Sequence, residues 1–322
     1  MYSFSSLKVC FVGVGSIASK HILNLSDICR KDNIELHIDA VRRNSGANSS
    51  DAVMNAMQYV ENVYSDITEA GIIYDIVFIT NPTDMHISML RSVEEYGRHF
   101  FIEKPVVSVA RIEEADTYKK DTNKVYYVAC PMRYTPVLQY IKNNVNAEDV
   151  ISVRSISSSY LPQWRPGTDY RKCYSAIKAL GGGVAIDLIH EWDYLAWLFG
   201  YPKDVHSFLS RKSNLEIDTE DAAVYIADYE DKLVELHLDY FGRKTMREIM
   251  IFTNDDTIVG DFVDNSVRFL KEGRIVNFDT DSRGVGQLEM RHFLDIIDGA
   301  CANDNDIDTA VKTLKLTQGI LE

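Results

Sequence analysis

The chain has 322 residues, of which 46% are apolar and 25% are charged, and its formal net charge is −14. This length favours two domains with separate hydrophobic cores. The acidic balance argues against a nucleic-acid or membrane partner, because either surface would require a basic footprint on the protein.

Five cysteines are scattered along the sequence, and no two of them have the spacing of a CxxC motif. They form neither a disulfide framework nor a zinc-site pattern, so we expect reduced thiols and no bound metal. The N-terminal segment lacks a basic region ahead of its short apolar run, and no apolar run is long enough to span a bilayer. These features predict a cytoplasmic protein.

In the first part of the chain, short apolar runs alternate with amphipathic segments. Alternating strands and helices form βαβ units with right-handed crossovers, which build a doubly wound parallel sheet. We therefore predict an N-terminal dinucleotide-binding Rossmann domain over residues 1–125. Its predicted elements are strand Leu7–Val14, helix Ser16–Lys31, strand Ile34–Val41, strand Tyr74–Thr80, helix Asp84–Tyr96, strand His99–Ile102 and helix Val109–Lys120.

From about residue 126, several β-rich runs follow one another with few helices between them, which indicates an antiparallel or mixed sheet. We predict a C-terminal α+β domain over residues 126–322 with a large, mostly antiparallel sheet that binds substrate and mediates oligomerisation. Helical patterns near Gly286–Ala300 and Thr309–Leu321 close the chain, and the last helix can pack back on the first domain. The predicted strands are Val150–Tyr160, Val205–Ser210, Ala222–Asp228, Leu233–Tyr240, Glu248–Thr253 and Thr257–Phe262.

A glycine-rich turn, GVGSIA at residues 13–18, joins the first predicted strand to the first predicted helix. This is the GxGxx(G/A) pattern at the position where a Rossmann domain holds a dinucleotide pyrophosphate. Gly13 permits the tight turn, Gly15 lets the backbone approach the phosphates, and Ala18 allows the helix to pack closely on the strand. Ser16 and Ile17 begin the helix, whose free amide groups and positive dipole end favour an anion.

The second predicted strand ends in Ala40-Val41-Arg42-Arg43, where an acid would grip the ribose hydroxyls of NAD. Two arginines at this edge suit the 2′-phosphate of NADP, which a guanidinium can hold with two hydrogen bonds. Asp39 is the competing ribose ligand, although it lies inside the predicted strand. We therefore favour NADP over NAD, with a solvated strand end as the alternative explanation of the arginines.

The stretch GGGVAIDLIHEWDYLAWLFG, residues 181–200, predicts an apolar helix behind three glycines, yet it carries Asp187, His190 and Asp193. Ionisable groups are rarely buried without a partner or a function. Helical spacing places Asp187, His190 and Tyr194 on one stripe. From the residues alone, His190 is either a hydrogen-bonded core residue or a catalytic base, and Asp193 is a structural partner. The glycines would let the backbone pass close to cofactor or substrate.

Several motifs occur together in a fixed order along the chain. They are the GxGxxA-x-x-H start that ends at His21, the turn Thr80-Asn81-Pro82 with His86, the triplet Glu103-Lys104-Pro105, Arg133-Tyr134-x-Pro136, and the GGG…DLIHEWD helix. With these motifs the chain resembles the glucose–fructose oxidoreductase/inositol dehydrogenase (Gfo/Idh/MocA) family along essentially its whole length.

The resemblance implies hydride transfer between a nicotinamide and a sugar-like hydroxyl or carbonyl carbon. It places Lys104 in the active site and assigns the family's acid and histidine to Asp187 and His190. Many members space these two residues four apart, whereas here they are three apart, so His190 is the firmer assignment. In such chemistry His190 would exchange the hydroxyl proton and Lys104 would stabilise the developing alkoxide. Glu103 and Pro105 would shape the turn that presents Lys104.

The segment 161–176, LPQWRPGTDYRKCYSA, mixes turn formers with aromatic and cationic residues. Aromatic rings can stack on a sugar face, and arginines can hold a carboxylate or phosphate, so this segment predicts a binding site for an anionic sugar. An ordered connection packed over the second domain is the alternative. The predicted substrate-binding residues are Arg133, Trp164, Arg165, Tyr170, Arg171 and Tyr174, together with Asp187 and His190.

Taken together, these patterns predict an NAD(P)-dependent oxidoreductase that acts on a sugar or sugar derivative and forms a homodimer or homotetramer. The predicted cofactor-binding set also includes Thr80, Asn81, Pro82, His86, Glu103 and Lys104. Two alternatives remain: an enzyme that recycles its cofactor without releasing it, and a non-catalytic NADP sensor or scaffold, because fold alone does not fix function.

Overall fold

The computed structural model describes residues 2–42, 50–279 and 282–321, and the predicted ligand Arg43 lies outside them. The chain forms two compact units, the first comprising residues 1–130 and 282–311 and the second comprising residues 131–281 and 312–322. The division therefore falls at Cys130 instead of residue 125, and residues 282–311 group with the first unit although the sequence pattern assigned them to the second domain.

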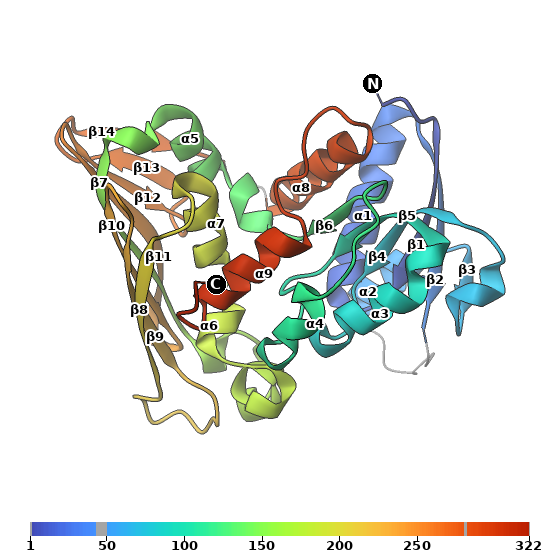
Figure 1. Ribbon diagram of the computed structural model, residues 1–322, viewed down its shortest axis with the longest axis horizontal. Coiled ribbons are helices and arrows are strands. Elements are labelled where there is room, and N and C mark those ends of the chain that lie inside the picture. The colour runs from blue at the N-terminus through green and yellow to red at the C-terminus, as the bar shows by residue number, and fades with distance from the viewer. Residues whose placement is uncertain (1, 43–49, 280–281, 322) are drawn as a thin grey trace. The chain divides into compact units, whose positions relative to one another are not determined.

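The first unit contains a six-stranded parallel sheet with the order β3-β2-β1-β4-β5-β6 (Figure 1). This arrangement confirms the predicted Rossmann fold. The strand order reverses between β1 and β4, and dinucleotides bind at the carboxyl ends of the strands at such a switch point. The strands are β1 (Ser6–Val12), β2 (Glu35–Val41), β3 (Asn62–Tyr64), β4 (Tyr74–Ile79), β5 (Gly97–Ile102) and β6 (Tyr126–Val128), and the helices are α1 (Ser16–Asp32), α2 (Asp51–Met57), α3 (His86–Val93) and α4 (Ile112–Asp116).

A fifth helix of this unit, α8 (Ser282–Ile297), comes from the far end of the sequence and packs against α1. Its Phe293 is fully buried and meets the rings of Phe78 and Phe101 edge-on, with centroids 6.3 and 5.3 Å apart. Its Glu289 accepts a hydrogen bond of 2.6 Å from the backbone N–H of Cys130. The core of the first unit is therefore completed by residues more than 150 positions away from its last strand.

The second unit contains an eight-stranded sheet with the order β14-β13-β12-β11-β7-β10-β9-β8, and α5, α6 and α7 lie on one face of it (Figure 1). All neighbouring strands pair antiparallel except β7 and β10, which confirms the predicted mostly antiparallel sheet. The bounds are β7 (Val150–Tyr160), β8 (Asp204–Ser210), β9 (Ala222–Asp228), β10 (Leu233–Asp239), β11 (Phe241–Thr253), β12 (Thr257–Asp261), β13 (Ser266–Phe269), β14 (Arg274–Asn277), α5 (Pro136–Asn144), α6 (Val184–Asp187) and α7 (His190–Phe199). The last helix, α9 (Ile307–Leu316), begins in the first unit and ends in the second.

The predicted helix over residues 184–199 is interrupted in the structure. Leu188 leaves the helical region with φ −99° and ψ 30°, and the backbone N–H groups of Ile189 and Glu191 bond to carbonyls three residues back. A tightened turn of this kind ends one helix before the next begins. Asp187 therefore ends α6 and His190 begins α7, so the prediction that both lie on one stripe of one helix is wrong.

Candidate active site

The glycine turn between β1 and α1 is held against the loop that follows β4. Gly13 has φ +86°, and a Cβ at this position would lie 2.9 Å from the Cα and N atoms of Asn81. The Gly13 N–H donates to the carbonyl of Val41 at 3.0 Å, and the Thr80 hydroxyl donates to the Gly13 carbonyl at 2.6 Å. Only glycine combines this backbone conformation with so close an approach.

The start of α1 presents amide groups without a side-chain cap. Gly15 is the N-cap residue and, as a glycine, has no side chain that could form a capping hydrogen bond. The first turn of the helix contains no acidic residue. A Cβ on Gly15 would meet no atom of the described residues within 4 Å, so its outer side is open. Ala18 is fully buried against the sheet, whereas Ser16 and Ile17 are exposed. Free amides and open space at a helix start suit a phosphate group.

Asn81 follows β4 and carries a buried side-chain amide whose nitrogen and oxygen both lack a hydrogen-bond partner among the described residues. Buried polar groups are rarely left unsatisfied in native proteins. Since Asn81 touches Gly13, these two atoms lie at the edge of the sheet where a dinucleotide would bind, and a bound ligand would satisfy them. The next residue, Pro82, is exposed.

The two candidate ribose ligands near the end of β2, Asp39 and Arg42, differ in how their side chains are engaged. Asp39 is buried, and its carboxylate accepts hydrogen bonds of 2.9 Å from the Asn62 amide and 2.8 Å from the Tyr74 hydroxyl. Its oxygens are therefore engaged within the sheet. Arg42 follows the strand, is half-buried, and donates its backbone N–H to the carbonyl of Tyr64 at 3.0 Å.

Glu103 and Lys104 follow β5 and lie at the same sheet edge as the glycine turn, because β1, β4 and β5 are neighbouring parallel strands. Glu103 is buried and contacts His21 with 2.6 Å between the carboxylate oxygen and Nε2. Burial alone would raise the pKa of Glu103, but the hydrogen bond and charge of His21 hold it below its usual value. The Lys104 ammonium is half-buried and makes no ion pair or hydrogen bond with the described residues.

His86 connects the two loops of this edge. Its ring lies between the carbonyl of Pro105 at 2.9 Å from Nδ1 and the carbonyl of Asn81 at 2.8 Å from Nε2. The side chain is 1% exposed, and burial lowers its pKa. His86 therefore fixes the loop after β4 relative to the turn that carries Lys104, and neither ring nitrogen points to an external ligand.

In the second unit, Asp187 lies at the centre of a hydrogen-bonded aromatic cluster. Its buried carboxylate accepts a hydrogen bond of 2.5 Å from the Tyr240 hydroxyl and another from the Tyr174 hydroxyl. Trp164 meets the Tyr240 ring edge-on with centroids 5.2 Å apart, and the Arg165 guanidinium lies over the Tyr174 ring at 5.7 Å. Tyr240 is fully buried, whereas Tyr174 is 43% exposed. The cluster thus reaches solvent through Tyr174 and Arg165.

Two of the three glycines before α6, Gly182 and Gly183, lie too close to other groups of the second unit to carry a side chain. A Cβ on Gly182 would overlap the carbonyl oxygen of Tyr174, and a Cβ on Gly183 would overlap the carboxylate of Glu220. Gly183 also has φ +135°. Glu220 accepts a hydrogen bond of 3.3 Å from the Ala185 N–H, and burial raises its pKa. Sequence reasoning missed Glu220, because no motif marks an acid in the loop before β9.

Arg133 was predicted to bind substrate, but the structure gives it internal contacts. Its guanidinium is buried and forms a bidentate ion pair with Asp193, with N···O distances of 3.0 and 2.6 Å. Asp193 was expected to have a structural role, and Arg133 is the partner with which it forms this buried ion pair. Tyr194, expected beside His190, is fully buried and shares a hydrogen bond of 2.6 Å with Ser155. Neither Arg133 nor Tyr194 reaches solvent.

The remaining predicted substrate ligands differ in their availability. Arg171 is neutralised by Asp169 at 2.8 Å and Glu216 at 3.1 Å. The Tyr170 hydroxyl accepts the backbone N–H of Glu216 at 3.2 Å. Arg165, by contrast, has no carboxylate within ion-pair distance among the described residues.

His190 is half-buried and occupies the first turn of α7. It precedes Glu191, which is fully buried and pairs with Arg247 at 2.6 Å. Its neighbours along the helix therefore anchor α7 in the second unit, while the histidine itself keeps access to solvent.

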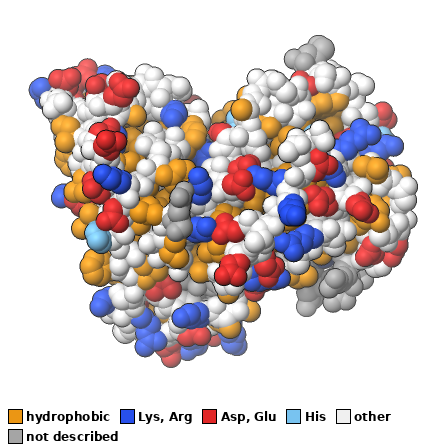
Figure 2. Space-filling model, in the orientation of Figure 1, with side chains coloured by type: hydrophobic (Ala, Val, Ile, Leu, Met, Phe, Trp, Pro, Cys, Tyr) orange, Lys and Arg blue, Asp and Glu red, His pale blue; other side chains and the backbone are white. Residues whose placement is uncertain are grey.

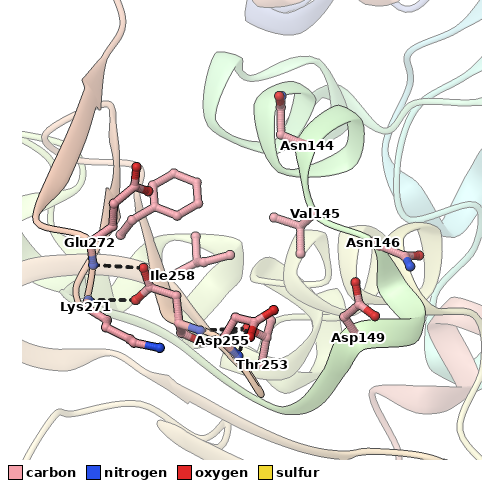
Figure 3. A pocket seen from close by; sticks show the side chains of 11 residues that line it. Asn144, Val145, Asn146, Asp149, Thr253, Asp255, Ile258, Lys271 and Glu272 are labelled. Carbon is pink, nitrogen blue, oxygen red and sulfur yellow. Dashed lines mark hydrogen bonds between the residues drawn. The ribbon is translucent and has the colours of Figure 1, made fainter.

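A separate cavity of about 480 Å³ lies in the second unit between the end of α5 and the loops of the sheet (Figure 3). It is lined mainly by Asn144, Asn146, Asp149, Asp255, Lys271 and Glu272, with an apolar wall of Val145, Ile258 and Phe269. The nearby Asp256 is committed to the backbone N–H groups of Lys271 and Glu272, at 2.7 and 3.1 Å. None of the predicted site residues lines this cavity, so it is not the candidate active site.

Within the described part of the chain, no helix is long and apolar enough to cross a membrane, and no group of three or more histidine, cysteine or acidic side chains is arranged to hold a metal.

Two family models match the sequence. The model of the GFO_IDH_MocA oxidoreductase family, described as an NAD-binding Rossmann fold, matches residues 7–130. The model of the GFO/IDH/MocA C-terminal domain matches residues 138–259.

Curated relatives include the uncharacterized oxidoreductase YrbE of Bacillus subtilis (strain 168), which is 27% identical over 192 residues, covering 59% of this chain and 52% of the relative. The scyllo-inositol 2-dehydrogenase (NAD(+)) of the same organism is 24% identical over 203 residues, covering 60% and 54% respectively. The chain thus spans about half the length of these curated relatives.

Solved structures with the same fold cover nearly the whole chain. Levoglucosan dehydrogenase in its apo form matches with a TM-score of 0.82 and 16% identity, over 98% of this chain and 96% of that protein. UDP-N-acetylglucosamine 3-dehydrogenase GnnA from Acidithiobacillus ferrooxidans matches with a TM-score of 0.74 and 18% identity, over 98% and 97%. The glycine turn, the Glu103-Lys104-Pro105 edge, the two-unit fold and the matches to both family models show that this chain belongs to the Gfo/Idh/MocA family of oxidoreductases.

Proposed function

We propose that the protein is an NADP-dependent oxidoreductase that transfers a hydride between the nicotinamide and a carbinol or carbonyl carbon of a sugar derivative. The observation that carries the proposal is the shared carboxyl edge of β1, β4 and β5, where the open turn at Gly15, the unsatisfied amide of Asn81 and the ammonium of Lys104 occur together. A dinucleotide at this edge would satisfy the amide and bring its reactive ring toward a cation that can bind oxygen.

Different residues of the first unit would bind different parts of the cofactor. The backbone of Gly13 to Ala18 would hold the pyrophosphate, and Thr80 and Asn81 would flank it. His86, Glu103 and Pro82 would act by shaping the loops. When bound, the nicotinamide supplies or accepts the hydride, and the protein positions the reacting carbon and handles the proton.

Two side chains are assigned the proton and oxygen chemistry. Lys104 would bind the substrate oxygen and stabilise the charge that develops on it, since its ammonium forms no hydrogen bond or ion pair with the described residues. Its charge also helps to lower the pKa of the neighbouring Glu103 carboxylate. His190 would exchange the hydroxyl proton, because an imidazole changes charge near neutral pH. Asp187 would act indirectly: both of its oxygens accept tyrosine hydroxyls, so it positions Tyr174 at the exposed end of the aromatic cluster.

The preference for NADP rests on Arg42 and Asp39. Because the Asp39 carboxylate is engaged by Asn62 and Tyr74, it is not available to the ribose hydroxyls. Arg42 follows β2 at the position from which a guanidinium can reach a 2′-phosphate.

The second unit suggests a sugar that carries a negative charge. Trp164 and Tyr174 offer aromatic surface for a sugar face, and Arg165 offers a cation that forms no direct ion pair with the described residues. The names of the similar proteins include dehydrogenases of scyllo-inositol, levoglucosan and UDP-N-acetylglucosamine, all of which carry several hydroxyl or ring oxygens. A sugar acid or nucleotide-sugar combines these features.

We also propose a homodimer or homotetramer formed through the outer face of the eight-stranded sheet. This face exposes Phe208, Ile226 and Leu233, which are 68%, 44% and 41% exposed. Apolar side chains are visible along the strands of the second unit in Figure 2. An exposed apolar sheet face commonly marks a protein interface.

The five free cysteines fit a reducing compartment such as the cytoplasm.

The proposal is tested by measuring turnover of both cofactors with a panel of neutral sugars, sugar acids and nucleotide-sugars. Reduction or oxidation of the nicotinamide by at least one anionic sugar, abolished in Lys104→Ala, supports the assignment. Tight NADP binding without turnover of any member would instead favour a sensor or scaffold. A product that forms while the nucleotide stays bound would identify a cofactor-recycling enzyme.

A further inference from the structure

Three side chains with the chemistry of a nucleophilic triad meet in the first unit beyond the cofactor edge. Cys301 is exposed on the turn after α8, and its Sγ lies 3.8 Å from Nδ1 of His292. The other ring nitrogen, Nε2 of His292, lies 2.9 Å from a carboxylate oxygen of Asp304. None of the three is used by the proposed oxidoreductase.

The contacts of His292 with Cys301 and Asp304 determine the protonation of its two ring nitrogens. Because Asp304 can only accept a hydrogen bond when ionised, Nε2 carries the proton and Nδ1 is left as an acceptor. The Cys301 thiol then faces the basic nitrogen, and the carboxylate lies on the far side of the ring. A nucleophile within reach of a base that a third group orients is the common arrangement of activated cysteines.

Nearby charges decide how such a thiol could react. Burial raises the pKa of Cys301, and the carboxylates of Asp295 and Asp304 raise it further. A bare thiolate is therefore disfavoured at this position. Transfer of the proton to His292 avoids that penalty, because the resulting imidazolium lies between the thiolate and Asp304. The ring of Tyr127, whose centroid is 6.2 Å from that of His292, covers another side of the histidine.

We propose that Cys301, with His292 as its base and Asp304 orienting that base, is a modification site that reacts with low-molecular-weight disulfides. The thiol proton passes to Nδ1 of His292 as the sulfur attacks one sulfur of the disulfide. A new S–S bond forms at Cys301, the original S–S bond breaks, and the departing thiolate takes up the proton. The exchange needs no external oxidant, since the incoming disulfide is reduced as Cys301 is oxidised.

The full-length protein is treated with bis(2-hydroxyethyl) disulfide, a neutral probe, and modification is followed at each cysteine by peptide mass spectrometry. Cys173, which is partly exposed and lies beside the Arg165 guanidinium without a histidine contact in the described part of the chain, is the internal reference. We expect Cys301 to react about tenfold or more faster than Cys173 at pH 7, and His292→Gln to remove that advantage. Equal rates at the two cysteines, or an unchanged rate in His292→Gln, would overturn the proposal.

Two carboxylate variants separate a triad from simple charge effects. Asp295→Asn removes a like charge near the thiol and should accelerate the reaction a few-fold. If Asp304 acts only as a second like charge, Asp304→Asn should accelerate it as well. We expect Asp304→Asn to slow it instead, by about tenfold, because the imidazolium loses its counter-charge; acceleration in this variant would contradict the triad.

Discussion

Gly13 and Asn81 approach each other so closely that a methyl group on Gly13 would lie 2.9 Å from the Asn81 backbone. The contact joins the loops after β1 and β4, the two strands at which the order of the parallel sheet reverses. Gly15, two residues later, has open space on the corresponding side. The two glycines of this motif therefore differ in function. Gly13 allows the two loops to pack together, and Gly15 leaves space for a ligand to approach the backbone.

Alanine substitutions should separate these tasks. Gly13→Ala must adopt φ +86° and displace Asn81, so we expect a loss of about 2–4 kcal/mol in the free energy of unfolding. Gly15→Ala should leave stability nearly unchanged but weaken dinucleotide binding about tenfold or more, because its methyl group would occupy the phosphate approach. Urea denaturation and cofactor titration distinguish the two, and unimpaired binding by Gly15→Ala would place the phosphates elsewhere.

Cofactor preference should depend on Arg42. Unaltered protein is expected to bind NADPH more tightly than NADH, and Arg42→Ala should weaken NADPH binding about tenfold while leaving NADH binding almost unchanged. Fluorescence titration of the reduced cofactors measures both constants. Asp39→Asn serves as the control, and it should reduce stability without altering the preference, since Asp39 bonds to Asn62 and Tyr74.

Turnover should require Lys104 and His190. Replacing either by alanine is expected to lower kcat by about two to four orders of magnitude, the usual effect of losing an acid–base or oxyanion group, with little change in NADP affinity. Stopped-flow measurement of nicotinamide absorbance reports the hydride step. Near-normal turnover in a folded His190→Ala variant would show that His190 is a structural residue and does not exchange the proton.

Tyr174 and Tyr240 form a matched pair, because both donate to Asp187 but only Tyr174 reaches solvent. Phenylalanine at either position should cost about 1–2 kcal/mol of unfolding free energy through loss of one hydrogen bond to a carboxylate. Only Tyr174→Phe should also raise KM or lower kcat for the substrate. Equal kinetic effects in the two variants would show that the cluster acts through stability alone.

The pair of Glu103 and His21 predicts a pH-dependent contribution to stability. Because the folded-state pKa of Glu103 is lowered, its stabilising contribution is complete above the unfolded pKa of about 4.3 and is lost as pH falls through the folded value. Glu103→Gln should therefore be less stable than the unaltered protein at pH 7, and the difference should shrink below about pH 4. Urea unfolding at several pH values tests this, and a difference that is constant with pH would exclude an ionic contribution.

The sequence allowed the sheet architecture to be predicted because strand patterns and glycine turns are local signals. The Gly13–Ala18 turn and most strands of both sheets follow from hydrophobic periodicity and backbone geometry, whereas the short strands β3, β6, β13 and β14 were not predicted. The break between α6 and α7 was not predictable in this way, because residues 184–199 contain no glycine or proline that would signal the end of a helix.

Site residues were harder to predict where the outcome depends on long-range partners. Arg133 has the composition of an anion ligand, but its bond to Asp193, 60 positions away, removes it from solvent. Glu220 lies against Gly183 only after the chain has folded. Pairings of this kind depend on tertiary packing and leave no periodic pattern in the sequence.

The return of α8 to the first unit has a consequence for how the chain can be cut. A fragment ending at Cys130 would lose Glu289, leaving the Cys130 N–H unsatisfied, and would lose Phe293, opening a hole beside Phe78 and Phe101. During synthesis, the first unit therefore cannot complete its core until α8 has been made, which happens only after the whole of the second sheet has been synthesised. Recombination that exchanges the sheet domain would have to join the chain at two points rather than one, which ties the inheritance of the two halves together.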